Sequence, residues 1–301
     1  MNIMITGGAG YIGTHLADKL KSIGHRIVLC DLSQKFTKYH YDNFECVSCD
    51  ITNYESVLKL PKCEVIYHLA AQVGTLGALD NLKFDLECNA LGTLNVSKFA
   101  ALNNVQTVIY SSSMAVYGEN ENAEETDLLQ PVSPYGISKM CGEHYINFYN
   151  QLNPDMRCVI YRIFNCYGPH QDTKNLTQGL VSIFLNQAIK SDTIQVKGSL
   201  ERFRDLIHVN DVINAMLLPL EDKSVEGIYN VCSGSKITLN NLIQLILKIS
   251  KKSVKAENIG GHAGDPHGVS GNNSKLIQHG WSPQTDIDKG ILECFEALTN
   301  E

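Results

Sequence analysis

A tyrosine and a lysine stand four residues apart in the segment SPYGISK, at Tyr135 and Lys139. The preceding Ser133 and Pro134 are typical of a helix N-terminus, with serine as the cap and proline in the first turn. Residues four apart share one face of a helix, so the phenol and the ammonium can act together in proton transfer. Taken alone, such residues most often form a solvated surface pair, so their chemistry depends on what surrounds them.

A glycine-rich segment, ITGGAGYIG, follows the first apolar run and opens a helical pattern. Its Gly7, Gly10 and Gly13 allow a tight turn and a close backbone approach to a pyrophosphate, whose charge is stabilised at a helix N-terminus. Asp31 ends the second apolar run, where a carboxylate can accept both ribose hydroxyls and repel a 2′-phosphate. This favours NAD over NADP. The nearby Lys35 moderates the preference, and turn formation is the alternative role for Asp31.

A third segment, VIYSSSMAVYG, ends another apolar run in three serines, Ser111 to Ser113. A triple serine by itself usually indicates a loop. In open α/β sheets, however, ligands bind beyond the carboxyl ends of the strands. We therefore expect these hydroxyls to face the cofactor crevice.

Six apolar runs alternate with helical patterns in the first half of the chain. They are apolar almost throughout, as strands covered on both faces are, and we predict helices near 53–60, 81–103 and 134–151. This alternation implies right-handed crossovers and a parallel sheet. The fold class is therefore α/β, with a doubly wound parallel (Rossmann) sheet. The six runs are NIMIT, RIVLC, FECVS, EVIYHLA, TVIYSS and CVIYRIF.

The pattern changes near Gly168 to longer loops, with helical patterns near 177–190 and 238–251. The later segment IYNVCSG is typical of one more strand that returns to the main sheet. We therefore expect a smaller, discontinuous α/β substrate domain beside the cofactor domain. The predicted bounds are 1–167 and 204–232 for the NAD-binding domain, and 168–203 and 233–301 for the nucleotide-sugar-binding domain.

The composition is that of an ordinary globular protein: 301 residues, 44% hydrophobic and 19% charged, with a net charge of −7. This acidic balance argues against a broad nucleic-acid or anionic-membrane surface, which needs a basic patch. An anionic small ligand remains compatible with locally placed positive groups. Neither a leader pattern nor a run of ~18 apolar residues is visible, so we expect a cytoplasmic protein without a membrane partner.

Ten cysteines are scattered along the chain, and Cys46 and Cys49 form a lone C-x-x-C pair. Buried, reduced thiols are the favoured interpretation over zinc ligands or disulfides. No histidine, cysteine or aspartate cluster has the spacing of a metal site. We expect His68 and His208, within strand-like runs, to be structural.

Ordered motifs over nearly the whole chain resemble those of the extended short-chain dehydrogenase/reductase family, and within it the nucleotide-sugar epimerases and dehydratases. The resemblance implies that Tyr135 is the acid/base and that Lys139 holds the nicotinamide ribose and favours the phenolate. Ser113 matches the catalytic serine or threonine that hydrogen-bonds the reacting sugar oxygen. The motifs are TGGAGYIG, Asp31, CDITN, HLAAQ, NALGTLN, SSSMAVYG, SPYGISK, RIFNCYGP, RDLIHVNDV, GIYNVCSG and HGWSP.

The resemblance also implies the remaining contacts of an NAD cofactor. They come from the glycine turn, from the ends of the following strands and from the catalytic segment. The implied cofactor-binding residues are Gly7, Gly10, Tyr11, Ile12, Gly13, Asp31, Asp50, Ile51, Leu69, Ala70, Ala71, Asn89, Ser111, Tyr135, Lys139 and Phe164.

The residues after Ser113 separate the reactions within this family. The dehydratases and the uronic-acid decarboxylases place carboxylates there, whereas this chain has Met114 and Ala115. Reversible hydride transfer remains, and the form SSSMAVYG most resembles the 4-epimerases, which pass through a transient 4-keto sugar. The alternatives are a nucleotide-sugar 4-ketoreductase, a CDP-sugar 2-epimerase and a non-catalytic dinucleotide sensor or scaffold.

Substrate contacts are implied for Ser113, Asn165, Arg204 and His262. Arg204 offers bidentate, permanently charged donors suited to a diphosphate, with an ion pair to Asp205 as the alternative and Arg202 as a substitute candidate. His262 replaces an arginine that is frequent in the family, which leaves the nucleotide open. Val269 lies where the 4-epimerases vary the residue that limits sugar size. The resemblance further implies a homodimer formed through the helices near 81–103 and 134–151.

Overall fold

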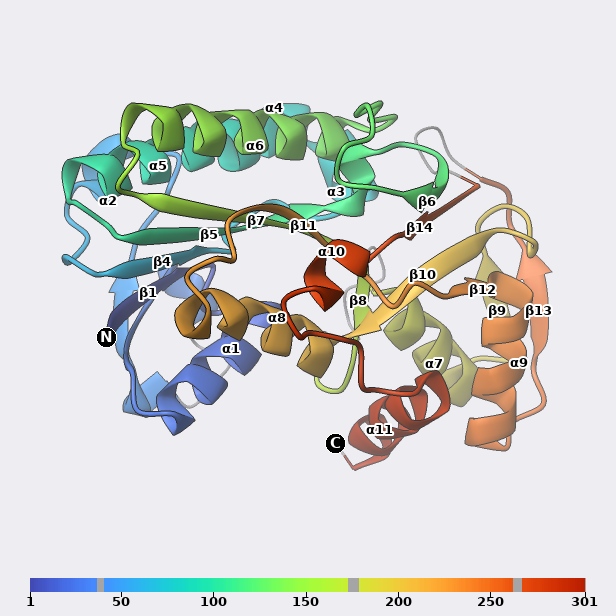
Figure 1. Cartoon of the computed structure of the whole chain (residues 1–301). Helices are drawn as coiled ribbons and strands as arrows, with labels where there is room; N and C mark the ends of the chain where they lie inside the picture. The colour runs from blue at the N-terminus through green and yellow to red at the C-terminus, as the bar shows by residue number, and fades with distance from the viewer. Residues whose placement is uncertain (37–40, 173–178, 262–266, 301) are drawn as a thin grey trace.

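A seven-stranded parallel sheet forms the first half of the molecule in the computed structural model, which describes residues 1–36, 41–172, 179–261 and 267–300 (Figure 1). Its strand order is β11-β7-β5-β4-β1-β2-β3, and every neighbouring pair is parallel. The order reverses between β1 and β4, and in open α/β sheets ligands bind beyond the carboxyl ends of the strands at such a point. The strands are β1 (Asn2–Thr6), β2 (Arg26–Asp31), β3 (Glu45–Ser48), β4 (Val65–His68), β5 (Thr107–Ser113), β7 (Arg157–Ile163) and β11 (Gly227–Val231).

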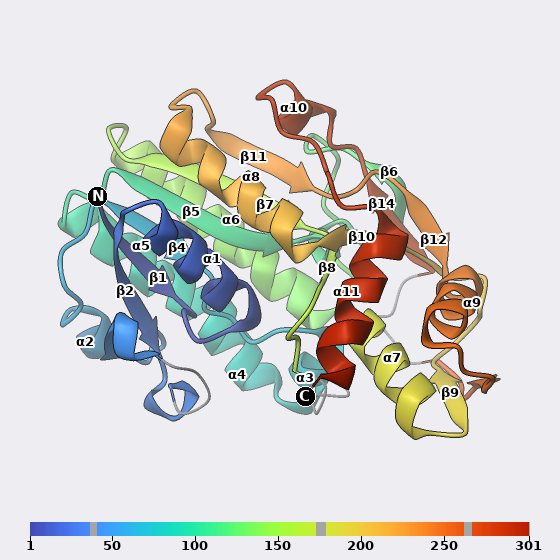
Figure 2. The same cartoon turned by 90° about the horizontal axis from the view of Figure 1, so that it is seen from below.

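Helices cover both faces of this sheet, which confirms the doubly wound class. In Figures 1 and 2, α1 and α8 lie on one face, and α4, α5 and α6 lie on the other. A π-helical turn, η3 (Glu87–Leu91), joins α4 to α5. The helices are α1 (Tyr11–Ser22), α2 (Tyr54–Val57), α3 (Thr75–Asp80), α4 (Leu82–Leu86), α5 (Gly92–Leu102), α6 (Pro134–Leu152) and α8 (Val209–Glu221).

The start of α6 agrees with the sequence prediction. Ser133 is the N-cap, and its hydroxyl oxygen accepts a hydrogen bond from the backbone N–H of Gly136 at 3.1 Å. Pro134 occupies the first turn. The helix therefore begins where local chemistry places it, and this fixes the position of Tyr135 one residue later.

The second half of the molecule is built on a smaller sheet, ordered β12-β10-β14-β6, with β8 paired to β10. The strands β9 and β13 form a separate parallel pair, and α7, α9 and α11 pack around their own apolar cluster. The strands are β6 (Asn120–Ala123), β8 (Asn165–Tyr167), β9 (Thr193–Val196), β10 (Phe203–His208), β12 (Lys236–Thr238), β13 (Lys255–Asn258) and β14 (Gly268–Gly271). The helices are α7 (Leu180–Lys190), α9 (Leu239–Ser250), α10 (Ser274–Ile277) and α11 (Ile287–Thr299).

The chain crosses between the two sheets more than once. It leaves the main sheet after β7, enters the smaller sheet at β8 and returns through α8 to β11, which pairs with β7. The expected return of IYNVCSG to the main sheet is therefore confirmed. β6, from the first half of the sequence, pairs with β14 from the end.

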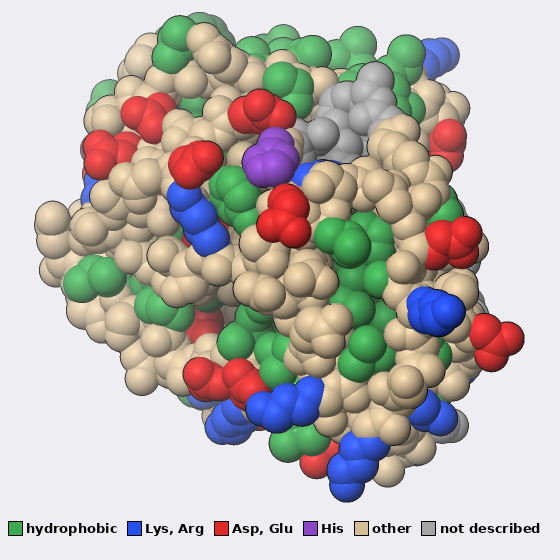
Figure 3. All heavy atoms as spheres, turned by 90° about the vertical axis from the view of Figure 1, so that its right-hand side faces the viewer, with side chains coloured by type: hydrophobic (Ala, Val, Ile, Leu, Met, Phe, Trp, Pro, Cys, Tyr) green, Lys and Arg blue, Asp and Glu red, His purple; other side chains and the backbone are tan. Residues whose placement is uncertain are grey.

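The surface over β9, β13 and α9 carries charges of both signs. Figure 3 shows Lys and Arg side chains interspersed with Asp and Glu on this face, around small apolar areas. Within the described ranges, no helix combines the length and apolar character that a bilayer-spanning segment needs.

All ten cysteines lie within the described residues and are free thiols. Seven are buried, and burial raises the pKa of Cys30 well above its ordinary value. Their thiols are therefore protonated packing groups at neutral pH. In the part of the chain that the structure describes, no group of three or more His, Cys, Asp or Glu is arranged to hold a metal ion.

Candidate active site

The glycine turn after β1 is too tight for any other residue. Gly7 has a φ of 71°, and a Cβ placed there would lie 2.6 Å from the backbone nitrogen of Ala70. A Cβ at Gly13 would lie 2.4 Å from the carbonyl oxygen of Gly7. Gly10 caps the N-terminus of α1. The turn therefore brings bare backbone and a helix N-terminus to one point, an arrangement that suits a pyrophosphate.

Asp31 is tied to this turn at the end of β2. Its Oδ2 accepts a hydrogen bond from the backbone N–H of Ala9 at 3.1 Å, and its Oδ1 accepts one from Leu32 at 2.8 Å. Burial raises the pKa of Asp31, while these two N–H groups and Lys35 act in the opposite direction. Because a carboxylate has about four lone-pair sites, two remain for the hydroxyls of a ribose. Asp31 and the glycine turn thus fit an adenine dinucleotide.

Several other predicted cofactor residues lie along the same crevice edge. Leu69 and Ala70 follow β4, and their backbone lies against Gly7. Ser111 lies near the end of β5 and donates a hydrogen bond to the carbonyl oxygen of His68 at 3.3 Å. Asp50 follows β3 with its carboxylate accepting hydrogen bonds from Thr52. The partly buried Tyr11, Ile12 and Ala71 also belong to this edge.

Three predicted cofactor residues have side chains committed to the protein. Asn89 is buried, and its amide nitrogen donates to Gln72, Asp85 and Ser138. Ile51 packs against Gly92, where a Cβ would lie 2.5 Å from its Cδ1. Phe164 is 2% exposed, with its ring against Gly271. The structure thus gives these side chains a packing role.

The catalytic candidates Ser113, Tyr135 and Lys139 come from two neighbouring elements. Ser113 ends β5, and its hydroxyl oxygen accepts a hydrogen bond from the Ala115 N–H in the following 3-10 turn (Met114–Val116). Gly136 permits the approach of α6 to this turn, because a Cβ there would lie 2.4 Å from the carbonyl oxygen of Ala115. The first turn of α6 is thereby held against the end of β5.

The protonation states of the pair depend on burial. Burial raises the pKa of Tyr135 to about 12, an effect increased by Asp85 and opposed by the Ser113 hydroxyl, which hydrogen-bonds the phenol oxygen. Burial lowers the pKa of Lys139 to about 8, with Cys88, Glu143 and Asp85 raising it. The ammonium of Lys139 is therefore charged at neutral pH.

The implied substrate residues lie at the smaller sheet. Asn165 in β8 donates from its amide nitrogen to the carbonyl oxygen of Asp205 at 3.0 Å. Arg204 in β10 donates to the carbonyl oxygens of Phe203 and His267. The buried Asp205 carboxylate accepts from the backbone N–H groups of three other residues: Ser233, Gly234 and Gly271. These backbone donors satisfy the Asp205 carboxylate.

The three remaining candidates for substrate binding are Arg202, Val269 and His262. Arg202 is buried and donates to the carbonyl oxygen of Lys197, which makes it a link between β9 and β10. Val269 is 1% exposed within β14. His262 lies outside the described residues.

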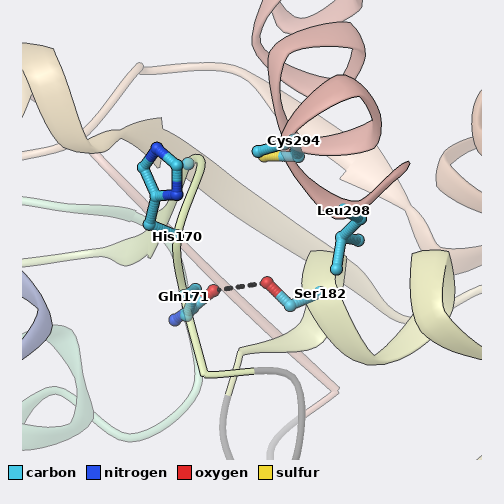
Figure 4. A pocket seen from close by; sticks show the side chains of 7 residues that line it. His170, Gln171, Ser182, Cys294 and Leu298 are labelled. Carbon is cyan, nitrogen blue, oxygen red and sulfur yellow. Dashed lines mark hydrogen bonds between the residues drawn. The ribbon is translucent and has the colours of Figure 1, made fainter. Parts of the chain in front are cut away.

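A small cavity lies next to the loop that follows β8. It measures about 10 Å³, which is the space that a single water molecule requires. Figure 4 shows His170, Gln171, Ser182, Cys294 and Leu298 around it, with the Ser182 hydroxyl donating to Gln171 at 2.9 Å. This cavity is too small for a nucleotide sugar.

The family model described as NAD dependent epimerase/dehydratase matches residues 3–232. The chain belongs to this family. It is 31% identical over 313 residues to UDP-glucose 4-epimerase of Mycolicibacterium smegmatis, covering 100% of this chain and 99% of the relative. It is 30% identical over 310 residues to dTDP-4-dehydro-6-deoxyglucose reductase of Escherichia coli, covering 98% and 97%.

Solved structures agree with this assignment. The structure of UDP-glucose 4-epimerase from Thermotoga maritima with UDP-glucose superposes with a TM-score of 0.91, at 29% identity over 100% of this chain and 99% of that one. The family is NAD-dependent. The chain is therefore an enzyme of this family, and the fit of the glycine turn and Asp31 to a dinucleotide is consistent with NAD as its cofactor.

The structure also reveals site residues that sequence reasoning missed. Glu143 lies one turn beyond Lys139 in α6 and forms a buried ion pair with Arg162, with Nη2 and Oε2 2.7 Å apart. Ser112, next to Ser113, donates to the same carboxylate. Asp85 is buried beside the pair and acts on both pKa values. The four-residue spacing between Lys139 and Glu143 is the one sequence signal that could have indicated this.

Proposed function

We propose that this enzyme is an NAD-dependent nucleotide-sugar 4-epimerase that acts on a UDP-hexose or a related nucleotide diphosphate sugar. The observation that carries the proposal is the placement of Ser113, Tyr135 and Lys139 together at the carboxyl edge of β5, beside the glycine turn. The relatives named UDP-glucose 4-epimerase support it over the length of the chain.

The neighbouring residues favour this chemistry over dehydration. Met114 and Ala115 supply no carboxylate to remove a carbon-bound proton. The buried Asp85 is an acid that acts on the pKa of Tyr135, and it accepts a hydrogen bond from the Asn89 amide at 3.0 Å. Its hydrogen bonding to Asn89 and Ser138 suits a fixed charge better than a base facing substrate.

The chain's own residues move one proton in this proposal. NAD, when bound, supplies a reversible hydride acceptor beside the sugar. Tyr135 takes the proton of the sugar's 4-hydroxyl and later returns it, while Ser113 hydrogen-bonds the same oxygen. Lys139 stabilises the phenolate form of Tyr135 during the transfer. The 4-keto sugar turns about its diphosphate linkage between the two transfers, so the product has the opposite configuration.

The smaller sheet supports the nucleotide side of the proposal. Arg204 and Asn165 lie on paired strands, β10 and β8, with Leu206 opposite Asn165 in the register. An arginine and an amide in this arrangement suit a diphosphate. His262, in the place of an arginine that is frequent in the family, remains a proposed phosphate contact whose removal is expected to weaken nucleotide binding.

The test is turnover without added reductant. Purified enzyme given UDP-glucose, UDP-N-acetylglucosamine and UDP-glucuronic acid should convert one of them to its 4-epimer, followed by NMR of the anomeric protons. Tyr135→Phe should lower turnover by about 10²–10⁴-fold at unchanged thermal stability. A fully active Phe variant would refute the role of Tyr135.

A nucleotide-sugar 4-ketoreductase is the second candidate, because the Escherichia coli relative is named dTDP-4-dehydro-6-deoxyglucose reductase, which describes the reduction of a 4-keto sugar. A ketoreductase uses the same three residues but consumes reduced cofactor and releases it oxidised. An epimerase retains NAD through each cycle. Mass spectrometry of the cofactor that copurifies, together with its absorbance at 340 nm during turnover, separates the two.

A further inference from the structure

An aromatic ring lies directly beneath the ammonium of Lys139. Tyr110 in β5 is fully buried, and the Nζ of Lys139 is 4.2 Å from the centre of its ring. Lys139 itself is 2% exposed. A cation over an aromatic face is stabilised by the ring's negative charge distribution, and most strongly where water is excluded. The buried ammonium of Lys139 therefore lies against the face of an aromatic ring, an apolar surface that stabilises a positive charge.

The close approach is built into both elements. Gly142, three residues after Lys139, faces the same tyrosine, and a Cβ there would lie 2.2 Å from the Tyr110 hydroxyl oxygen. On its other side, Tyr110 stacks on His68, with ring centroids 5.4 Å apart and an interplanar angle of 26°. His68 is fixed at both ring nitrogens by Thr6 and Thr93. The ring of Tyr110 is thus held in place from both sides.

We propose that Tyr110 is a positioning residue for the reaction, which keeps Lys139 charged and in place through a cation–π contact. The catalytic consequence of this proposal rests on the proposed function, whereas the cation–π contact does not. Tyr110 acts through Lys139 and has no expected contact with substrate. Neither the sequence motifs nor the family description assigns it this role.

Other charged and titratable groups also face Lys139 and must be considered with the ring. They come from every element packed around the ammonium, and the acidic ones favour its charge. His68 is uncharged at neutral pH, because burial and Lys139 lower its pKa to about 3. These groups are Asp85 from α4, Cys88 from η3, Glu143 from α6 and His68 from β4. A substitution at Tyr110 replaces none of these groups, and the one that stacks on its ring, His68, is uncharged.

The direct test is the titration of the Lys139 side chain, observed by NMR in ¹⁵N-lysine-labelled holoenzyme and assigned with Lys139→Met. Tyr110→Leu should lower the midpoint by about one pH unit, a shift that corresponds to a contribution of about 1.4 kcal/mol from a desolvated cation–π contact. Tyr110→Phe retains the ring and should stay within a few tenths of a unit. A midpoint unchanged in Tyr110→Leu would overturn the proposal.

A control and a second series keep the test decisive. Tyr161→Leu removes another fully buried tyrosine of the same sheet, whose hydroxyl donates to Ala215, and should not move the Lys139 midpoint. If Tyr110→Leu does not fold, fluorinated phenylalanines at position 110 keep the shape of the ring and weaken its face stepwise. The midpoint should then fall with each added fluorine, and a constant midpoint would exclude the contact.

Activity supplies the catalytic readout. In Tyr110→Leu the alkaline limb of the pH–rate profile should shift to lower pH by the same number of pH units as the Lys139 midpoint. In Tyr110→Phe this limb should stay at the pH of the unmodified enzyme. A shifted midpoint in a protein without epimerase activity would support the contact and refute the proposed function. An active epimerase in which Tyr110→Leu leaves the Lys139 midpoint unchanged would support the proposed function and refute the contact.

Discussion

At the scale of single residues, we expect the working pH range of this site to depend on one buried ammonium. The pKa of Lys139 is lowered to about 8, so the charge is present below that pH and is lost above it. We expect turnover to fall as the pH rises through about 8, in a rate profile measured with saturating substrate. In Lys139→Arg the guanidinium stays charged, so the remaining activity should no longer fall as the pH rises through about 8. If it still falls there, a group other than Lys139 causes the loss of activity.

Asp31 should control the choice between the two nicotinamide cofactors. Its carboxylate is held at the glycine turn by Ala9 and Leu32, where it repels a 2′-phosphate. We predict that Asp31→Asn weakens NAD binding by about tenfold or more, as expected for the loss of a charged hydrogen-bond acceptor. Binding of NADP should improve in the same variant, with Lys35 close by. Calorimetric titration with both cofactors measures the change, and a parallel loss of both would contradict it.

At the scale of elements, the ion pair of Glu143 and Arg162 connects the catalytic helix to the sheet. Both side chains are 3% exposed, and Arg162 also donates to the Tyr117 hydroxyl and the Glu125 carbonyl. Removing one partner leaves a buried charge without compensation. We predict that Glu143→Ala lowers the free energy of unfolding by about 3–5 kcal/mol, measured by urea denaturation.

The exposed pair of Arg26 and Glu45 is the matched control for this prediction. Its two atoms are 2.9 Å apart, but the side chains are 71% and 43% exposed. Glu45→Ala should therefore change stability by no more than about 1 kcal/mol. Equal effects of the two substitutions would show that burial does not decide the strength of the Glu143 pair.

Local patterns predicted the elements that carry the site but not their mutual fit. The apolar runs, the glycine turn and the Ser133 cap depend on neighbouring residues, so the sequence indicated them directly. The roles of Gly136 and Gly142 depend on how closely α6 approaches β5, which no local pattern records. Asp85 and Tyr110 belong to different elements from the catalytic pair, so their proximity arises only in the tertiary structure. The helix α11 was not predicted either.

At the scale of the whole molecule, the two sheets are joined by strands from distant parts of the sequence. Asn165 in β8 follows β7 of the main sheet directly, and Arg204 lies in the neighbouring β10. The proposed diphosphate contacts therefore continue from the carboxyl edge that carries Ser113. A substrate held by the smaller sheet would present its sugar to the catalytic residues of the larger one.

The outer face of α6 and its neighbour α4 carries large apolar side chains. Ile137, Phe148 and Leu152 of α6 are 47%, 51% and 60% exposed, and Leu82 and Leu86 of α4 are 57% and 55% exposed. A patch of this kind is typical of an association surface. We propose that two copies pair through it as a bundle of helices, which would cover these side chains.

Charge placed within this patch should prevent the association. A Leu86→Arg/Phe148→Arg variant buries two unpaired charges in any dimer that uses α4 and α6, so it should elute as a monomer in size-exclusion chromatography with light scattering. Leu292→Arg is the control, since Leu292 is 43% exposed on α11, away from α4 and α6 (Figure 1). That variant should keep the unmodified protein's mass. Dissociation by Leu292→Arg alone would place the interface on the smaller sheet's side instead.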